Sequence, residues 1–219
     1  MICFIRNRDN YTLRKRLHYF SAFTRRALAA LIAVLCISSL CHGQDSGTAS
    51  DSGEEETAIS PLSVGEKVPA EFWTREHLFY IDGDTVRKNL EEYKGKLLVL
   101  DFWATWCAIC LHQMGGKQSL FSHFPEKANL LLVNPLVTKD TYTSIASHQD
   151  RLSEFSTTPV FTSIIEDELI QQLFPNHIYP RYAWIGPRGD LIGLTTARFA
   201  TEGNLKEMLG ILDKDHEKE

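Results

Sequence analysis

The feature that most constrains this chain is a pair of cysteines, Cys107 and Cys110, which follows directly on a run of apolar residues. Residues 97–102 read LLVLDF, and such an almost continuous apolar run predicts a strand covered on both faces. Residues 103–110 read WATWCAIC, so the two cysteines leave this strand and open the next helix. A Cys-x-x-Cys pair at such a junction is typical of a thiol–disulfide couple.

The first 43 residues predict a signal peptide that is removed from the mature protein. Basic residues gather between positions 14 and 26, and residues 27–40 form an apolar core of 14 residues. This core is short for a transmembrane helix, which needs about 20 residues. We expect cleavage before Gln44; the alternative is that the segment stays as an N-terminal membrane anchor. The pair Arg25-Arg26 leaves open whether export uses the general or the twin-arginine route.

Removal of residues 1–43 changes both the cysteine count and the charge. The other three cysteines, Cys3, Cys36 and Cys41, lie in this segment, so only the motif cysteines would remain. The segment holds seven basic residues and one acidic residue, and because the whole chain carries −5, the rest carries −11. An acidic protein without a basic cluster argues against nucleic acid or an anionic membrane surface as a partner.

The mature part predicts a linker, one domain and a tail. Residues 44–60 are rich in Ser, Gly, Asp and Glu and predict a disordered acidic linker. Residues 61–215 suit a single domain with a hydrophobic core of its own, and residues 216–219 form a charged tail.

The pattern of the domain predicts an α/β fold with a mixed central sheet and helices on both faces. A strand over 78–81 with a hairpin-type turn at 82–85 comes first, followed by a short element over 86–94. Strands are expected at 97–102, 129–134, 181–185 and 190–195, with an extended piece from 159. Helices are expected at 107–124, 140–155, 167–174 and 202–212.

Three ordered motifs resemble the exported TlpA/ResA-like branch of thioredoxin-fold proteins. They are the run DFWATWC with Cys110 at 101–110, the entry segment VGEKVPAEF at 64–72, and IYPRYAWIGPRG at 178–189. The resemblance spans about 61–212. It implies a thioredoxin-like three-layer sandwich with an added N-terminal hairpin, in a thiol–disulfide oxidoreductase of the bacterial envelope that needs no cofactor.

The resemblance also implies partners, and two departures qualify it. Members of this branch act on protein disulfides or dithiols, receive electrons from a membrane-bound donor, and include reductases for apocytochrome c. Ile109 stands where these motifs usually carry proline, which leaves the redox potential and the direction of electron flow open. Gly115 replaces the helix-kinking proline of thioredoxins, and the pair Gly115-Gly116 would provide a similar bend.

The position of the cysteines predicts their roles. Cys107 falls at the helix start, where free backbone N–H groups and the helix dipole stabilise a thiolate. Cys110 lies one helical turn further on and can close a disulfide ring. We therefore expect Cys107 to be the exposed, attacking residue and Cys110 the residue that resolves the mixed disulfide.

Four further residues are candidates for the site. Asp101 ends an apolar strand beneath the motif; burial would raise its pKa and let it take the proton of Cys110, like the buried aspartate of thioredoxin. The alternative is a solvent-facing Asp that caps a turn. The resemblance makes Tyr179-Pro180 a cis peptide bond that presents the Tyr179 backbone to an extended substrate strand. Trp106 is a candidate for partner contact, whereas Trp103 is expected to pack in the core.

Three other functions use the same residues. Cys107, Cys110 and His112 offer sulfur and nitrogen ligands for a copper chaperone, with His177 as a fourth ligand, although no second ligand cluster is present and we predict no metal site. A peroxiredoxin is disfavoured because residues 100–107 lack the Pro-x-x-x-Thr-x-x-Cys run. A structural disulfide is disfavoured by the expected exposure of Cys107.

Overall fold

A computed structural model describes residues 59–216, which form a three-layer α/β domain with a mixed seven-stranded sheet. The strand order is β2-β1-β5-β4-β3-β6-β7; β3, β4 and β5 run parallel to one another, and all other pairs are antiparallel. The strands are β1 (His77–Ile81), β2 (Asp84–Lys88), β3 (Leu97–Phe102), β4 (Ala128–Pro135), β5 (Thr162–Asp167), β6 (Arg181–Ile185) and β7 (Leu191–Thr196). The predicted fold class is therefore confirmed.

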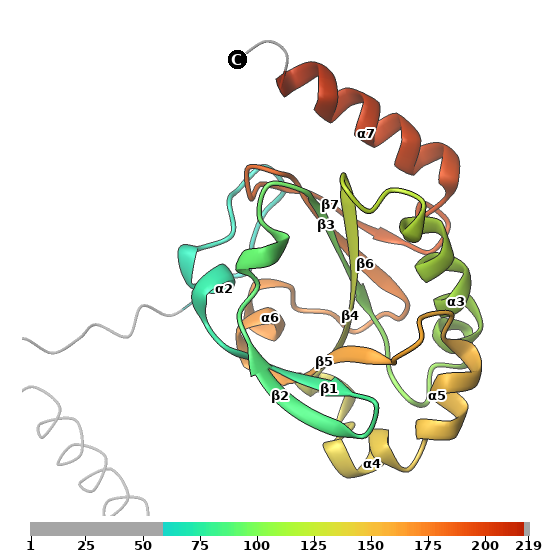
Figure 1. Cartoon of the computed structure of the whole chain (residues 1–219). Helices are drawn as coiled ribbons and strands as arrows, with labels where there is room; N and C mark the ends of the chain where they lie inside the picture. Colours follow the sequence, from blue (N-terminus) through green and yellow to red (C-terminus); the bar gives the residue numbers. More distant parts are fainter. Residues whose placement is uncertain (1–58, 217–219) are drawn as a thin grey trace, which may run out of the picture. The chain divides into compact units, whose positions relative to one another are not determined.

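Helices cover both faces of the sheet, as Figure 1 shows. The α-helices are α2 (Ala70–Thr74), α3 (Ala108–Ser122), α4 (Tyr142–Ala146), α5 (Gln149–Phe155), α6 (Glu168–Leu173) and α7 (Glu202–His216), and the 3₁₀ turns are η1 (Glu91–Tyr93) and η2 (Leu136–Thr138). On one face α2 and α6 enclose a core with Phe72, Leu100 and Ile170. On the other face α3, α5 and α7 bury the opposite side of the same strands.

Strand β3 has the bounds that its sequence predicts, and every residue in it is buried. It pairs with β4 on one side and β6 on the other, so both its edges and both its faces are covered. The predicted hairpin is also present. Asp82 and Gly83, with φ of 48° and 98°, occupy the turn between β1 and β2. Positive φ at both central residues matches the twist of a two-residue hairpin.

Some predicted elements differ from the structure. The helix expected at 140–155 is two helices, α4 and α5, because Ser147 and His148 both bond their side chains to the Ser144 carbonyl. Such side-chain bonds compete with the helical ladder and end the helix. The element expected at 86–94 is the end of β2 followed by η1, and α2 was not predicted. Helix α7 runs past 212 to His216.

Several predictions concern residues that the structure does not describe. The signal peptide at 1–43, most of the linker at 44–60 and the end of the tail lie outside residues 59–216. Within the described residues, no helix is long and apolar enough to cross a membrane.

Gly115 serves close packing between α3 and the end of α5. A Cβ atom at this position would lie 2.6 Å from the Phe155 carbonyl oxygen, whereas one at Gly116 would meet nothing within 4 Å. Across the same contact, the Thr157 hydroxyl donates to the Gly115 carbonyl at 3.0 Å. Helix α3 is continuous from Ala108 to Ser122. The structure thus gives Gly115 a steric reason in the packing of α3 against α5.

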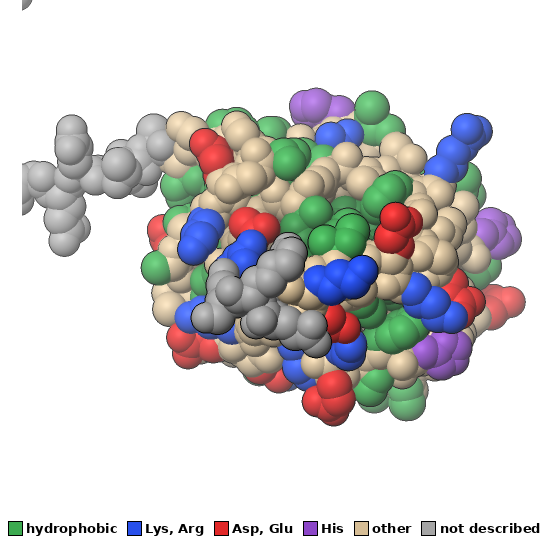
Figure 2. Space-filling view, turned by 90° about the horizontal axis from the view of Figure 1, so that it is seen from above, with side chains coloured by type: hydrophobic (Ala, Val, Ile, Leu, Met, Phe, Trp, Pro, Cys, Tyr) green, Lys and Arg blue, Asp and Glu red, His purple; other side chains and the backbone are tan. Residues whose placement is uncertain are grey.

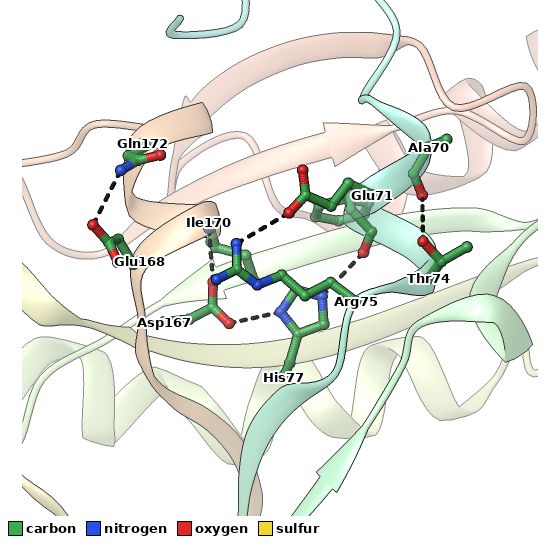
Figure 3. Close-up of polar contacts among 10 residues, drawn as sticks. Ala70, Glu71, Thr74, Arg75, His77, Asp167, Glu168, Ile170 and Gln172 are labelled. Carbon is green, nitrogen blue, oxygen red and sulfur yellow. Dashed lines mark hydrogen bonds and ion pairs between the residues drawn. The ribbon is translucent and has the colours of Figure 1, made fainter. Parts of the chain in front are cut away.

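A buried hydrogen-bonded pair, His77 and Asp167, joins α2, β1 and α6 on the face opposite α3 (Figure 3). The His77 ring contacts the Asp167 carboxylate through Nδ1 at 2.6 Å and the Phe72 carbonyl through Nε2 at 3.0 Å. The His77 ring thereby links the Asp167 side chain to the backbone of α2. The other Asp167 oxygen accepts the Ile170 N–H and caps α6. These hydrogen bonds connect α2 and α6 through the buried ring of His77.

Candidate redox site

The two motif cysteines form a disulfide at the start of α3. The Sγ atoms of Cys107 and Cys110 are 2.04 Å apart and the Cα atoms 5.3 Å apart, so the expected ring is closed. Cys107 is the N-cap of α3, and its sulfur accepts the backbone N–H of Cys110 at 3.3 Å. A helix N-terminus stabilises negative charge, so this position favours the thiolate of Cys107 once the disulfide is reduced.

Exposure does not separate the two cysteines, contrary to the prediction that Cys107 is the exposed one. In the disulfide form Cys107 is 6% exposed and Cys110 is 4% exposed. Both pack in the cluster that α3, α4 and α5 form on one face of the sheet. The two sulfurs therefore differ in their position at the helix cap and not in their exposure. Exposure of Cys107 can no longer be used as an argument against a purely structural disulfide.

Asp101 is a buried carboxyl on β3, and the alternative of a solvent-facing residue is wrong. Its partners in register are Leu132 on β4, which packs in the cluster that holds both cysteines, and Tyr182 on β6. Burial raises the pKa of Asp101 from 3.8 to about 8, and the Lys117 charge and a hydrogen bond with Tyr182 oppose this rise. The predicted rise is thus confirmed, and its cause is removal from water.

Lys117 is a member of the site that the sequence analysis missed. Its side chain is half-buried and donates to the Ala200 carbonyl, and burial lowers its pKa while Asp101 raises it. A signal was present in the sequence, because Cys110, Met114, Lys117 and Phe121 follow the helical spacing of one face. A lysine within an otherwise apolar stripe indicates a buried acidic partner.

A second buried carboxylate, that of Asp140, holds the turn between β3 and α3. It accepts the Thr105 backbone N–H at 2.7 Å, the Thr105 hydroxyl at 2.6 Å and the Asn134 amide at 2.8 Å. The neighbouring Thr138 carbonyl accepts the indole N–H of Trp106 at 3.2 Å. The sequence analysis placed Asp140 in a helix. The parallel pairing of β3 and β4 could have identified it, since polar residues after one strand then lie beside the motif after the other.

The loop before β6 completes the site. The Tyr179-Pro180 peptide bond is cis, as predicted. Tyr179 packs against the cluster that holds the cysteines, and its ring meets that of Trp106 edge-on with centroids 5.4 Å apart. Trp106 is 60% exposed, whereas Trp103 is fully buried, with its indole N–H on the Ser163 hydroxyl at 2.8 Å. Trp103 is thus a packing residue, as expected, and Trp106 and Tyr179 form an aromatic wall beside the motif.

The ligands considered for a copper chaperone do not assemble into a metal site. Within residues 59–216 there is no group of three or more His, Cys, Asp or Glu side chains placed to hold a metal ion. His112 is exposed and packs its ring edge-on against Phe155. Cys107, Cys110 and His112 therefore do not converge.

A cysteine pair at the start of a helix and a cis-proline loop, carried on this mixed sheet, define a thioredoxin-fold protein. Solved structures agree. A putative thiol:disulfide interchange protein DsbE from Chlorobium tepidum aligns over 69% of this chain and 99% of its own, with a TM-score of 0.51 and 18% identity. The MTB protein DsbF aligns over 66% of this chain and 98% of its own, with a TM-score of 0.50 and 22% identity.

Two curated sequences narrow the class. The thioredoxin-like protein YneN of Bacillus subtilis is 35% identical over 48 residues, 22% of this chain and 28% of YneN. The thiol-disulfide oxidoreductase ResA of Oceanobacillus iheyensis is 36% identical over 64 residues, 29% of this chain and 32% of ResA. The chain thus matches about a third of each relative's length, and no family model matches it. The chain thus has a thioredoxin-like fold, and part of its sequence is similar to ResA and YneN.

Proposed function

We propose that this protein is a thiol–disulfide oxidoreductase that exchanges electrons with other proteins through Cys107 and Cys110. The observation that carries the proposal is the Cys107–Cys110 disulfide at the N-terminus of α3, with a sulfur that already accepts a helix N–H. The names of the sequence relatives point the same way.

The reduced protein acts in two steps. The Cys107 thiolate attacks one sulfur of a substrate disulfide; a mixed disulfide forms and the other substrate sulfur leaves as a thiolate. The Cys110 thiol then loses its proton, and its sulfur attacks the Sγ atom of Cys107. The Cys107–Cys110 disulfide forms and the second substrate sulfur leaves. Two electrons pass to the substrate, and an external dithiol must restore the reduced protein.

Asp101 is the proposed proton acceptor for Cys110. A carboxyl group with a pKa of about 8 and a thiol with an ordinary pKa of about 8.5 are closely matched, which favours proton transfer from the thiol to the fraction of Asp101 that is ionised, and this fraction grows as the pH approaches 8. Tyr182 on β6 forms a hydrogen bond with this carboxyl, Lys117 on α3 acts on it through its charge, and both limit how far its pKa rises.

Trp106, Tyr179 and Pro180 are the proposed substrate-binding residues. Within residues 59–216 no backbone hydrogen bond involves Tyr179, so its N–H and C=O are free to pair with an extended segment. Such pairing would lay the substrate strand beside the disulfide. The exposed face of Trp106 would then cover the apolar part of that segment.

The physiological setting is also part of the proposal. We place the protein in the cell envelope, exported by its N-terminal signal peptide, where it reduces protein disulfides with electrons from a membrane-bound donor. Apocytochrome c is a candidate substrate. The sequence resemblance to ResA supports this setting, and the structure supports only the exchange chemistry.

A trapping experiment tests the proposed exchange. The Cys110→Ser variant should accumulate a mixed disulfide with a disulfide-bonded protein substrate, because its Cys107 can attack but nothing resolves the product. The Cys107→Ser variant should form none, and wild-type protein should form the complex only transiently. Equal trapping by the two variants would contradict the assigned roles, and no trapping by either would exclude the exchange function.

A further inference from the structure

A groove opens beside the disulfide, between α3 and the turn that follows β7. It has a volume of about 410 Å³, and its lining residues are Ile109, Gln113, Ile178, Tyr179, Pro180, Thr196, Ala197 and Arg198. Ile109 and Gln113 are four residues apart on α3 and so share a face, and Ile109 lies between the two cysteines. One wall of the groove is therefore the face of α3 with Ile109 and Gln113, and this wall begins next to the two cysteines.

The groove carries one charge, and that charge is positive. Arg198 is the only charged residue among the eight that line it, although the chain after residue 43 is strongly acidic. Elsewhere the surface is mixed: on the face seen in Figure 2, acidic and basic side chains alternate with hydrophobic ones. Arg198 is exposed, and no ion pair to it is found within residues 59–216.

The turn that carries Arg198 is held in place. The Phe199 N–H donates to the Thr196 carbonyl at 3.0 Å and closes the turn over Ala197 and Arg198. The Phe199 ring meets Trp184 edge-on, and the Asn204 amide donates to the Phe199 carbonyl at 2.7 Å. A guanidinium on an anchored turn loses less freedom on binding a ligand than one on a loose loop.

The other lining residues of the groove are uncharged, and both apolar and polar side chains are among them. The Oε1 atom of Gln113 is buried and has no hydrogen-bond partner. An extended peptide offers backbone N–H groups, apolar side chains for Ile109 and Ile178, and an acidic side chain for Arg198.

We propose that Arg198 is a specificity-determining residue that selects protein substrates with a carboxylate close to the reacting cysteine. The occupant of the groove is an extended segment of the substrate, with its cysteine at Cys107, an apolar residue over Ile109 and an Asp or Glu side chain against the guanidinium. This inference rests on the proposed exchange function and adds the chemistry of the preferred substrate.

The test uses disulfide-linked peptides that differ at one position. Glu, Gln or Lys is placed in turn at each of the four positions on either side of the reacting cysteine. Reduction rates are then measured with the reduced protein at low ionic strength. The reduction rate of 2-hydroxyethyl disulfide, a small neutral disulfide, measures the activity of the Cys107–Cys110 couple on a substrate that does not fill the groove. The variants are Arg198→Glu and Arg87→Glu, the second being an equal charge change on exposed β2, at the opposite edge of the sheet.

Wild-type protein should reduce the Glu peptide about three- to tenfold faster than its Lys counterpart at one or two positions, as expected for a partly exposed ion pair replaced by repulsion. Arg198→Glu should reverse this preference, Arg87→Glu should retain it, and salt should weaken it. If the ratio of the reduction rates for the Glu and Lys peptides is unchanged in Arg198→Glu, Arg198 does not determine specificity. Normal reduction of the small disulfide by the same variant would show that the proposed exchange function still holds. Failure to reduce even the small disulfide would remove both.

Discussion

The replacement Asp101→Asn tests how the buried carboxyl affects folding. The structure buries Asp101 between β4 and β6 and beneath α3, and raises its pKa from 3.8 to about 8. In the unfolded chain this carboxyl ionises near pH 4, whereas in the folded protein it keeps its proton until about pH 8. The unfolded state therefore gains stability relative to the folded state as the pH rises through this window.

The size of the effect follows from the two pKa values. Each pH unit in the window costs the folded protein up to 1.36 kcal/mol, so the free energy of unfolding falls by at most about 5 kcal/mol between pH 4 and pH 8. The effects of the Lys117 charge and of the Tyr182 hydrogen bond are already included in the raised pKa. Asparagine has nearly the same shape and does not ionise, so this loss should disappear in Asp101→Asn.

Urea unfolding of the oxidised protein at pH 5, 7 and 9 measures the difference. Relative to wild type, Asp101→Asn should be more stable by about 1–2 kcal/mol at pH 5 and by about 4 kcal/mol more at pH 9, with an unchanged denaturant slope. Asp150→Asn, at an exposed position of α5, is the matched control and should follow the wild-type profile. Parallel pH profiles for Asp101→Asn and wild type would refute the assignment of a raised pKa to this residue.

Three further predictions, two of them with a matched control variant, test the helix packing, the buried His77–Asp167 pair and the turn before Cys107. Gly115→Ala should destabilise the protein by about 1–3 kcal/mol through its clash with a backbone carbonyl, whereas Gly116→Ala, with open space around it, should stabilise it by about 0.5–1 kcal/mol in thermal or urea unfolding. His77→Gln should cost about 3–5 kcal/mol, and Arg75→Ala, which removes an exposed ion pair, less than about 1 kcal/mol; equal costs would contradict the buried pair. Asp140→Ala should slow substrate reduction at least tenfold by releasing the turn before Cys107, and unchanged kinetics would assign it no positioning role.

The sequence predicted the parts of the fold in which local pattern and tertiary environment agree. Strands β3 and β6 have the predicted bounds because a central strand must be apolar on both faces. The break between α4 and α5 was not predicted, since no Gly or Pro marks it. It depends on hydrogen bonds from Ser147 and His148 that compete with the helix only in the folded geometry.

The sequence predicted those features of the site that depend on the spacing of residues within a motif. It predicted fewer of the features that depend on contacts between residues far apart in the sequence. The disulfide, the cis bond and the raised pKa of Asp101 all follow from the motif or its resemblance. The near-equal burial of the two cysteines does not follow from the motif. It results from the packing of α4 and α5 over the start of α3, and the motif does not determine where these two helices lie. Asp140 was missed for the same reason: its partner Thr105 is 35 residues away.

The central claim is that Cys107 and Cys110 form a reversible couple suited to reducing other proteins. The reduction potential tests it most directly, by equilibration of the protein with dithiothreitol or glutathione and measurement of the fraction in the disulfide form. The account predicts a single two-electron transition at or below about −270 mV, the potential of thioredoxin. A potential near −120 mV, that of strong oxidants, would contradict the reductase assignment, and the absence of any reversible transition would contradict the redox function itself.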